Sequence, residues 1–131
     1  MPSSPPVAIR RPSGANATES SFRVILGSVA GSMLGSGALF VVAEGTPMLP
    51  LALNVVRFFR NESCGKCVPC RVGTEKAVRI LEDAADGKPA AMGLMPELAD
   101  AMAMTSICGL GQAALNPILS AMKHFPGECG T

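Results

Sequence analysis

Three of the five cysteines in this 131-residue chain lie within seven residues, as Cys64-Gly-Lys-Cys67-Val-Pro-Cys70, and a fourth, Cys108, follows after 37 intervening residues. A Cys-x-x-Cys-x-x-Cys segment can direct three thiolates at three irons of a cubane, and a remote cysteine then binds the fourth iron. The fold must therefore bring two distant segments together. The pattern predicts a 4Fe-4S site with Cys64, Cys67, Cys70 and Cys108 as ligands.

Two other uses of grouped cysteines stay open on spacing alone. Zinc also binds four thiolates, but structural zinc sites usually take them as two separated pairs, whereas the division here is three plus one. A disulfide framework fits poorly with two-residue spacings and with the lack of a convincing secretory signal. Cys129, near the C-terminus, is predicted to be a spare thiol in a mobile tail, and the alternative is that it replaces Cys108 as the remote ligand.

Length and composition limit the fold and its partners. A chain of 131 residues forms one domain at most, and its cysteine-containing part has a small core that a bound cluster would stabilise. Eleven basic and ten acidic residues nearly cancel, which predicts no nucleic-acid partner. The chain has no Trp or Tyr but eight Met, a composition that suits closely packed helices.

The N-terminal part is predicted to be irregular. Residues 1–21 are rich in Pro and Ser and are expected to be a disordered tail. Residues 22–45 form a Gly-rich segment in which Val24 to Ala43 carries no charge, so a transmembrane helix is one alternative. Its many Gly and Ser residues instead favour two short strands, Phe22–Leu26 and Ala38–Ala43, and direct membrane insertion is not expected.

Residues 46–131 are predicted to form a helical iron-sulfur domain. The first helix would use Thr46 as its cap and Pro47 as its first residue. Its inward face would contain Leu51, Val55, Phe58 and Phe59. Overall the sequence predicts a mainly α fold, a small helical bundle that binds the cluster, preceded by the tail and the short β segment.

Three further helices are expected after the first cysteine segment. The second would start at Thr74 and stop at Asp86-Gly87, and the third would run from Pro96 to about Ala103. The fourth would start near Gly111, bend at Asn116-Pro117 and end at Phe125. The two cysteine segments would then follow the first and third helices.

Several neighbours of the cysteines have a predicted use. Gly65 and Gly109 have no side chains, so backbone N–H groups can approach the cluster sulfurs. Lys66 and Arg71 place positive charge nearby, which would raise the cluster's reduction potential, although both are equally explained as solvated surface charges. His124 is expected to favour a helix C-terminus and not to bind metal.

Residues 58–73 and 106–117 closely resemble the C-terminal iron-sulfur domain of the NADH-oxidising flavoprotein subunit of respiratory complex I. Related domains occur in the diaphorase subunits of NAD-dependent formate dehydrogenases and NAD-reducing hydrogenases. The resemblance extends over about residues 30 to 125. It implies that the four cysteines hold a 4Fe-4S cluster that accepts single electrons from a reduced flavin and passes them on.

The chain also departs from that family. The large upstream domain that binds FMN and NADH has no counterpart before residue 30, and most of the ubiquitin-like middle domain is missing. FMN and NAD are therefore expected only on a partner subunit, and the chain is not expected to be catalytic alone. Its initiating Met and Pro/Ser-rich start favour a separate short subunit over a fragment.

The predicted function is electron transfer within a multi-subunit NAD-linked oxidoreductase of the complex I, formate dehydrogenase or hydrogenase type. The expected partners are a flavin- and NAD-binding subunit and other iron-sulfur or catalytic subunits. The expected location is the cytoplasm or the cytoplasmic face of a membrane complex. The alternative is a non-redox docking module that a cluster or zinc only stabilises.

Overall fold

The computed structural model describes residues 22–24 and 41–129, which fall into two compact units that divide after Thr46. In the first unit, β1 (Phe22–Val24) pairs antiparallel with β2 (Val41–Ala43), and Phe22 lies opposite Ala43. These strands confirm the predicted short β segment in its described part. The predicted disordered tail and most of the uncharged run lie outside the described residues.

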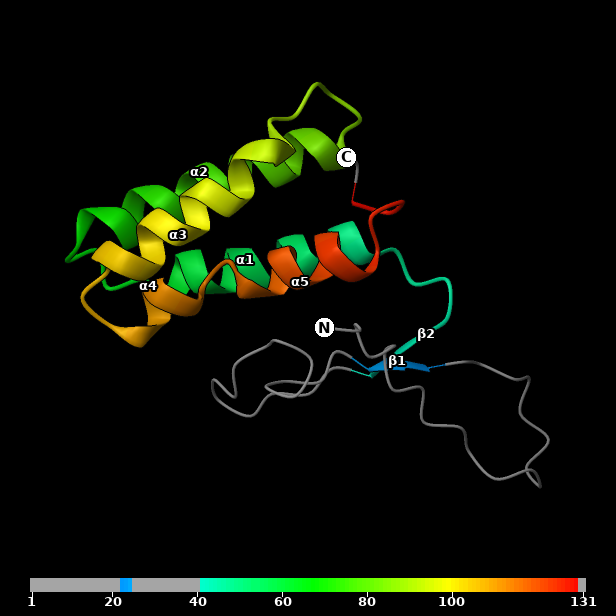
Figure 1. Ribbon diagram of the computed structural model, residues 1–131, viewed down its shortest axis with the longest axis horizontal. Coiled ribbons are helices and arrows are strands. Elements are labelled where there is room, and N and C mark those ends of the chain that lie inside the picture. The colour runs from blue at the N-terminus through cyan, green and yellow to red at the C-terminus, as the bar shows by residue number, and fades with distance from the viewer. Residues whose placement is uncertain (1–21, 25–40, 130–131) are drawn as a thin grey trace, which may run out of the picture. The chain divides into compact units, whose positions relative to one another are not determined.

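The second unit is a helical bundle (Figure 1). Its elements are α1 (Met48–Glu62), α2 (Val68–Ala85), the 3-10 turn η2 (Met92–Leu94), α3 (Met95–Thr105), α4 (Gly109–Ala113) and α5 (Asn116–His124). Helix α1 packs against both α2 and α5, and α3 packs against α2. The predicted mainly helical fold is confirmed. Among the described residues, none of the helices has the length and apolar character needed to cross a membrane.

The core of the bundle consists of aliphatic and methionine side chains from all four longer helices. Met48, Met95 and Met102 are almost completely buried, in agreement with the expectation that flexible methionines fill gaps between helices. Gly73 lets α2 and α3 approach closely, because a Cβ at that position would overlap the thioether of Met102. The bundle is therefore held by close packing between small and adaptable residues.

Helix α1 differs from the prediction at its start and in its buried face. Pro47 has an extended backbone and precedes the helix, while the Thr46 N–H donates to the Ala43 carbonyl at 3.2 Å within a turn. The buried face contains Met48, Ala52, Leu53 and Val56. Phe58, predicted to point inward, is 57% exposed. Because α1 packs against α2 and α5, the side of the helix that is buried differs from the side on which the aromatic residues lie.

The remaining helices differ mainly at their ends. Helix α2 begins at Val68, six residues before the predicted Thr74, and its C-cap is Asp86 next to Gly87 with φ 69°, as expected for a glycine stop. Thr74 is buried within the helix and donates its hydroxyl to the Cys70 carbonyl at 2.7 Å. The predicted third helix extends to Met95–Thr105, and the predicted fourth is divided into α4 and α5.

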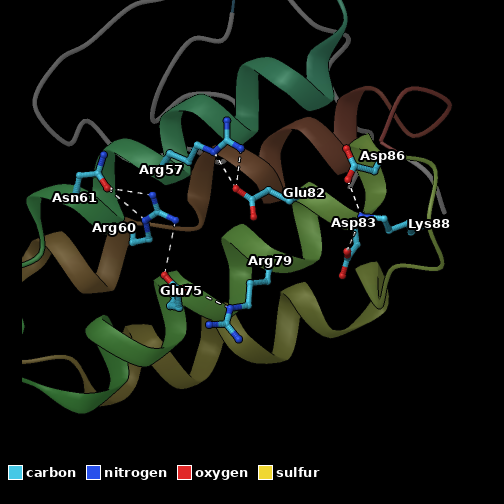
Figure 2. A network of polar contacts seen from close by, with 9 residues as sticks. All are labelled: Arg57, Arg60, Asn61, Glu75, Arg79, Glu82, Asp83, Asp86 and Lys88. Carbon is cyan, nitrogen blue, oxygen red and sulfur yellow. Dashed lines mark hydrogen bonds and ion pairs between the residues drawn. The ribbon is translucent and has the colours of Figure 1, made fainter.

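Ion pairs connect α1 and α2 on the outside of the bundle (Figure 2). Arg57 on α1 bonds Glu82 on α2 at 2.7 Å, and Glu75 lies between Arg60 at 3.7 Å and Arg79 at 3.1 Å. These side chains are substantially exposed, and such pairs usually contribute at most about 1 kcal/mol each. They align the two helices, whereas the apolar core supplies most of the stability.

The C-terminal segment closes the end of the bundle where α1 begins. The Glu128 carboxylate accepts a hydrogen bond from the Met48 N–H at 3.3 Å, and a negative charge there also favours the helix N-terminus. Cys129 is completely buried, and burial followed by the charge of Glu128 raises the pKa of its thiol. The prediction of a mobile thiol is therefore wrong for Cys129.

Replacing Cys129 by serine is expected to destabilise the fold by about 1–3 kcal/mol, because a hydroxyl would occupy an apolar buried position. Chemical unfolding of the full chain measures the change, and Cys129→Ala separates lost packing from the cost of the hydroxyl. Iron content should stay unchanged in both variants. Unchanged stability in Cys129→Ser would contradict the burial of this side chain.

Candidate metal centre

The connection between α1 and α2 carries the first predicted ligands and is shaped by Ser63 and Gly65. Ser63 ends α1 as its C-cap, and its hydroxyl accepts the Gly65 N–H at 3.3 Å. Gly65 has φ 72°, a left-handed conformation that costs little only for glycine. The Arg71 guanidinium donates to the Gly65 carbonyl at 3.4 Å. These contacts fold the connection back towards the first turn of α2.

The three clustered cysteines occupy different local positions. Cys64 is exposed in the connection, Cys67 is the N-cap of α2, and Cys70 is buried in the first turn of α2. Cys67 and Cys70 are three residues apart at a helix start, which places them on the same side of α2. The Ser63 hydroxyl lies 3.3 Å from the Cys70 sulfur. Because α2 starts early, Cys70 lies within the helix, whereas Cys64 lies in the connection between α1 and α2.

The surroundings of Cys67 favour the thiolate, which is the form that binds metal. Hydrogen bonding to the backbone of Ile107 is the largest effect that lowers the pKa of the Cys67 thiol, and the backbone of Cys70 adds to it. Exposed N–H groups at the start of α2 act in the same direction. The first of these effects comes from the segment just before Cys108, so the two cysteine segments are in contact.

The second segment lies directly against Cys70. Cys108 is the exposed N-cap of α4, and Gly111 lies in the first turn of that helix. A Cβ added to Gly111 would lie 2.9 Å from the Cys70 Cβ and 2.7 Å from the Ser106 Cβ, closer than side chains pack. Both cysteine-bearing connections are found at the same end of the bundle (Figure 1). Residues separated by about forty positions in the sequence therefore lie next to one another.

The other predicted neighbours contribute less to the geometry of this site. Lys66 and Arg71 are exposed, and an added Cβ at Gly109 would meet no atom within 4 Å. His124 lies in the last turn of α5. Within residues 22–24 and 41–129, no three Cys, His, Asp or Glu side chains gather as one metal-binding group. In a four-iron cubane each cysteine binds a different iron, so its ligands surround the cluster and do not converge on one ion.

Sequence reasoning missed three residues that shape the site. The Ser63 hydroxyl lies 3.3 Å from the Cys70 sulfur, and Gly111 allows α4 to approach both Cys70 and Ser106. The sequence holds a signal for each: a serine lies one or two positions before Cys64 and Cys108, and Gly111 is the second glycine of Cys-Gly-Leu-Gly. Gly109 adjoins the predicted ligand Cys108, but an added Cβ there would meet nothing. Gly111 is the glycine whose missing side chain leaves room for Cys70 and Ser106.

Two curated proteins resemble most of this chain. The chain is 37% identical over 103 residues to the NADH-quinone oxidoreductase F 2 subunit of Rhizobium meliloti (strain 1021), and the match covers 77% of this chain and 24% of that protein. It is 38% identical over 99 residues to the NADP-reducing hydrogenase subunit HndC of Solidesulfovibrio fructosivorans, covering 74% of this chain and 20% of that protein. The chain thus spans about a quarter or less of the curated relatives that it matches.

A solved structure resembles the chain as well. An NAD+-reducing [NiFe]-hydrogenase in the H2-reduced state matches with a TM-score of 0.65 and 33% identity over 71% of this chain and 17% of that chain. Residues 50–131 match the family described as the NADH-ubiquinone oxidoreductase-F iron-sulfur binding region, whose cofactor is a 4Fe-4S cluster. The chain belongs to this 4Fe-4S binding family, together with its relatives in NADH-quinone oxidoreductases.

Proposed function

We propose that this chain is an electron-transfer subunit of a multi-subunit NAD-linked oxidoreductase. Cys64, Cys67, Cys70 and Cys108 would hold the 4Fe-4S cluster. The chain would pass single electrons between a flavin bound by a partner subunit and further iron-sulfur clusters. The parent assembly would be of the complex I, formate dehydrogenase or hydrogenase type.

The observation that best supports this function is the contact between the two cysteine segments at one end of the bundle. The pKa of the Cys67 thiol is lowered chiefly by the backbone of Ile107, and Cys70 packs against the helix that begins after Cys108. Three thiolates from one segment and one from another match the ligand pattern of a cubane. Membership of the iron-sulfur family supplies the identity of the cofactor.

The exposed apolar surface near the cysteines also supports a role within an assembly. Val68 and Val72 on α2 are 60% and 52% exposed, Met104 near the end of α3 is 85% exposed, and Ile107 next to Cys108 is 73% exposed. Exposed large apolar side chains often mark a protein interface. A partner that covers them would shield the cluster from water and bring an electron donor or acceptor close to it.

The residues of this chain would only bind the cluster and adjust its reduction potential. The cluster, when bound, accepts and releases one electron at a time, whereas a flavin accepts a hydride as two. The chain supplies thiolates, and burial of Cys70 keeps water from that part of the site. The N–H groups at the start of α2 would stabilise the negative charge that reduction adds to a bound cluster. No bond of a substrate is made or broken by these residues.

NADH oxidation would take place on the partner. FMN and NAD would be bound there. A flavin- and NAD-binding subunit and other iron-sulfur or catalytic subunits are the proposed partners. We place the assembly in the cytoplasm or at the cytoplasmic face of a membrane complex.

Mixing the chain with its flavin-containing partner provides the direct test. The isolated chain should show no NADH-dependent dye reduction, whereas its cluster should be reduced by NADH within turnover once the partner is present. Rapid-mixing spectroscopy follows the flavin and cluster absorbance together. Cys129→Ala, changed outside the proposed ligand set, should behave as the wild type.

The alternative function is a non-redox docking module. In that case the cluster or a zinc ion would only stabilise the fold, and the exposed apolar side chains would bind the partner protein. A wild-type complex whose flavin is reduced while the cluster stays oxidised through turnover would favour this alternative. Zinc without sulfide in the purified chain would exclude the redox function.

A further inference from the structure

Ser106 is a buried residue whose side chain is left without a hydrogen bond. Its exposed fraction is 6%, its N–H donates to the Met102 carbonyl at 2.9 Å, and its carbonyl accepts from the Gln112 amide at 3.1 Å. The backbone is therefore fully engaged. The hydroxyl, by contrast, has no partner among the residues that the structure describes. A buried hydroxyl without a partner is costly, so its retention at this position calls for an explanation.

The Ser106 hydroxyl is located at the junction of the two cysteine segments. The Cβ position of Gly111 is 2.5 Å from the Ser106 Oγ and 2.9 Å from the Cys70 Cβ, so both groups flank the same point of α4. Ser106 is also the C-cap of α3, two residues before Cys108. The hydroxyl therefore lies between the two segments whose cysteines would hold the cluster.

We propose that the Ser106 hydroxyl donates a hydrogen bond to a sulfur at the Cys70 corner of the cluster and thereby raises its reduction potential. The proposal rests on the proposed function, since it takes Cys70 as a ligand. Reduction adds negative charge that spreads over the sulfurs, and a donor fixed by the fold stabilises the reduced state more than the oxidised one. The O–H bond of Ser106 stays intact, and the cluster gains only its single electron.

The two hydroxyls near Cys70 have different environments. Ser63 Oγ accepts the Gly65 N–H at 3.3 Å and also lies 3.3 Å from the Cys70 sulfur, so it has partners before a cluster is bound. Ser106 gains its partner only with the cluster. The effect of Ser106 on the bound cluster should therefore be specific, because its hydroxyl contributes no hydrogen bond to the fold of the described residues.

The test is an EPR-monitored redox titration of the full chain with its cluster reconstituted. Ser106→Ala should make the cluster about tenfold harder to reduce, which corresponds to a fall in potential of about 59 mV for one electron. Ser106→Thr keeps the hydroxyl and should stay near the wild-type potential. Ser120→Ala on α5 is the matched control for loss of a serine hydroxyl outside the two cysteine segments and should change nothing.

Proton ENDOR of the reduced cluster gives a second readout. A coupling that disappears when H2O is replaced by D2O should be present in the wild type and in Ser106→Thr, and absent from Ser106→Ala. An Ala variant with an unchanged potential and coupling would overturn the proposal. So would an Ala variant that takes up no cluster, because the proposal gives Ser106 no part in ligation. Failure of the wild-type chain to take up a cluster would instead count against the proposed function.

Discussion

Replacing Cys108 by alanine is expected to lower the iron content from about four per chain to three or none. Three ligands on the first segment can still hold three irons, but the fourth iron has no other cysteine among the proposed ligands. Iron and acid-labile sulfide are measured on anaerobically purified protein, together with the visible absorbance of the cluster. The wild type should give about four iron and four sulfide per chain.

Cys129→Ala is the control for this experiment, because it also removes a cysteine but one that is buried in the C-terminal segment. It should retain all its iron. If Cys108→Ala kept four irons and Cys129→Ala lost them, the fourth ligand would be Cys129. That result would also require the C-terminal segment to leave the start of α1, where Glu128 accepts the Met48 N–H.

Adding one methyl group at Gly111 should have the second largest effect. In Gly111→Ala the new Cβ would lie 2.7 Å from the Ser106 Cβ and 2.9 Å from the Cys70 Cβ, two atoms that are attached directly to the backbone and cannot rotate away. Overpacking of this kind typically costs about 1–3 kcal/mol. It also pushes the Cys108 segment away from Cys70, so the variant should hold less iron and lose the remainder faster to a chelator.

Gly109→Ala is the matched control, since an added Cβ there would meet nothing within 4 Å. Both variants replace a glycine by alanine in the first turn of α4 and keep the backbone N–H. Iron content and the rate of loss to the chelator should equal the wild-type values in Gly109→Ala. Equal behaviour of the two variants would show that close approach of α4 to Cys70 is not needed for cluster binding.

The helical nature of the bundle and the grouping of its cysteine segments could be predicted from the sequence. Strong local signals decide such features: Pro near helix starts, Gly87 at the end of α2, and ligand spacing that requires two segments to meet. The break at Asn116-Pro117 was also visible, and it appears as the division between α4 and α5. These signals act within a few residues and need no knowledge of partners.

The errors concern features that tertiary packing decides. The preference of threonine for helix caps suggested Thr74 as a start, but α2 begins six residues earlier and buries that side chain. The helical spacing of Leu51, Val55 and Phe58 predicts an inward face that includes Phe58, yet this side chain is exposed. Cys129 was assigned to a mobile tail because chain ends are often disordered, whereas Glu128 and Met48 fasten this end.

The steric need for Gly111 and the unpaired hydroxyl of Ser106 could not be derived from the sequence either. Both depend on how closely α4 approaches Cys70, a distance that joins residues about forty positions apart. A glycine or serine next to a cysteine has many local explanations. The reason for Gly111 and Ser106 becomes apparent only when the arrangement of the two cysteine segments is known.

The bundle is closed differently at its two ends. Where α1 begins, the chain itself closes it through Glu128 and the buried Cys129. Helix α1 has 15 residues and so is about 22 Å long, and the proposed cluster ligands lie beyond its other end. Loss of a damaged cluster would therefore open one end while the other keeps the helices in register. On the proposed ligand set, the unfilled bundle would keep its helices together and could take up iron and sulfide again.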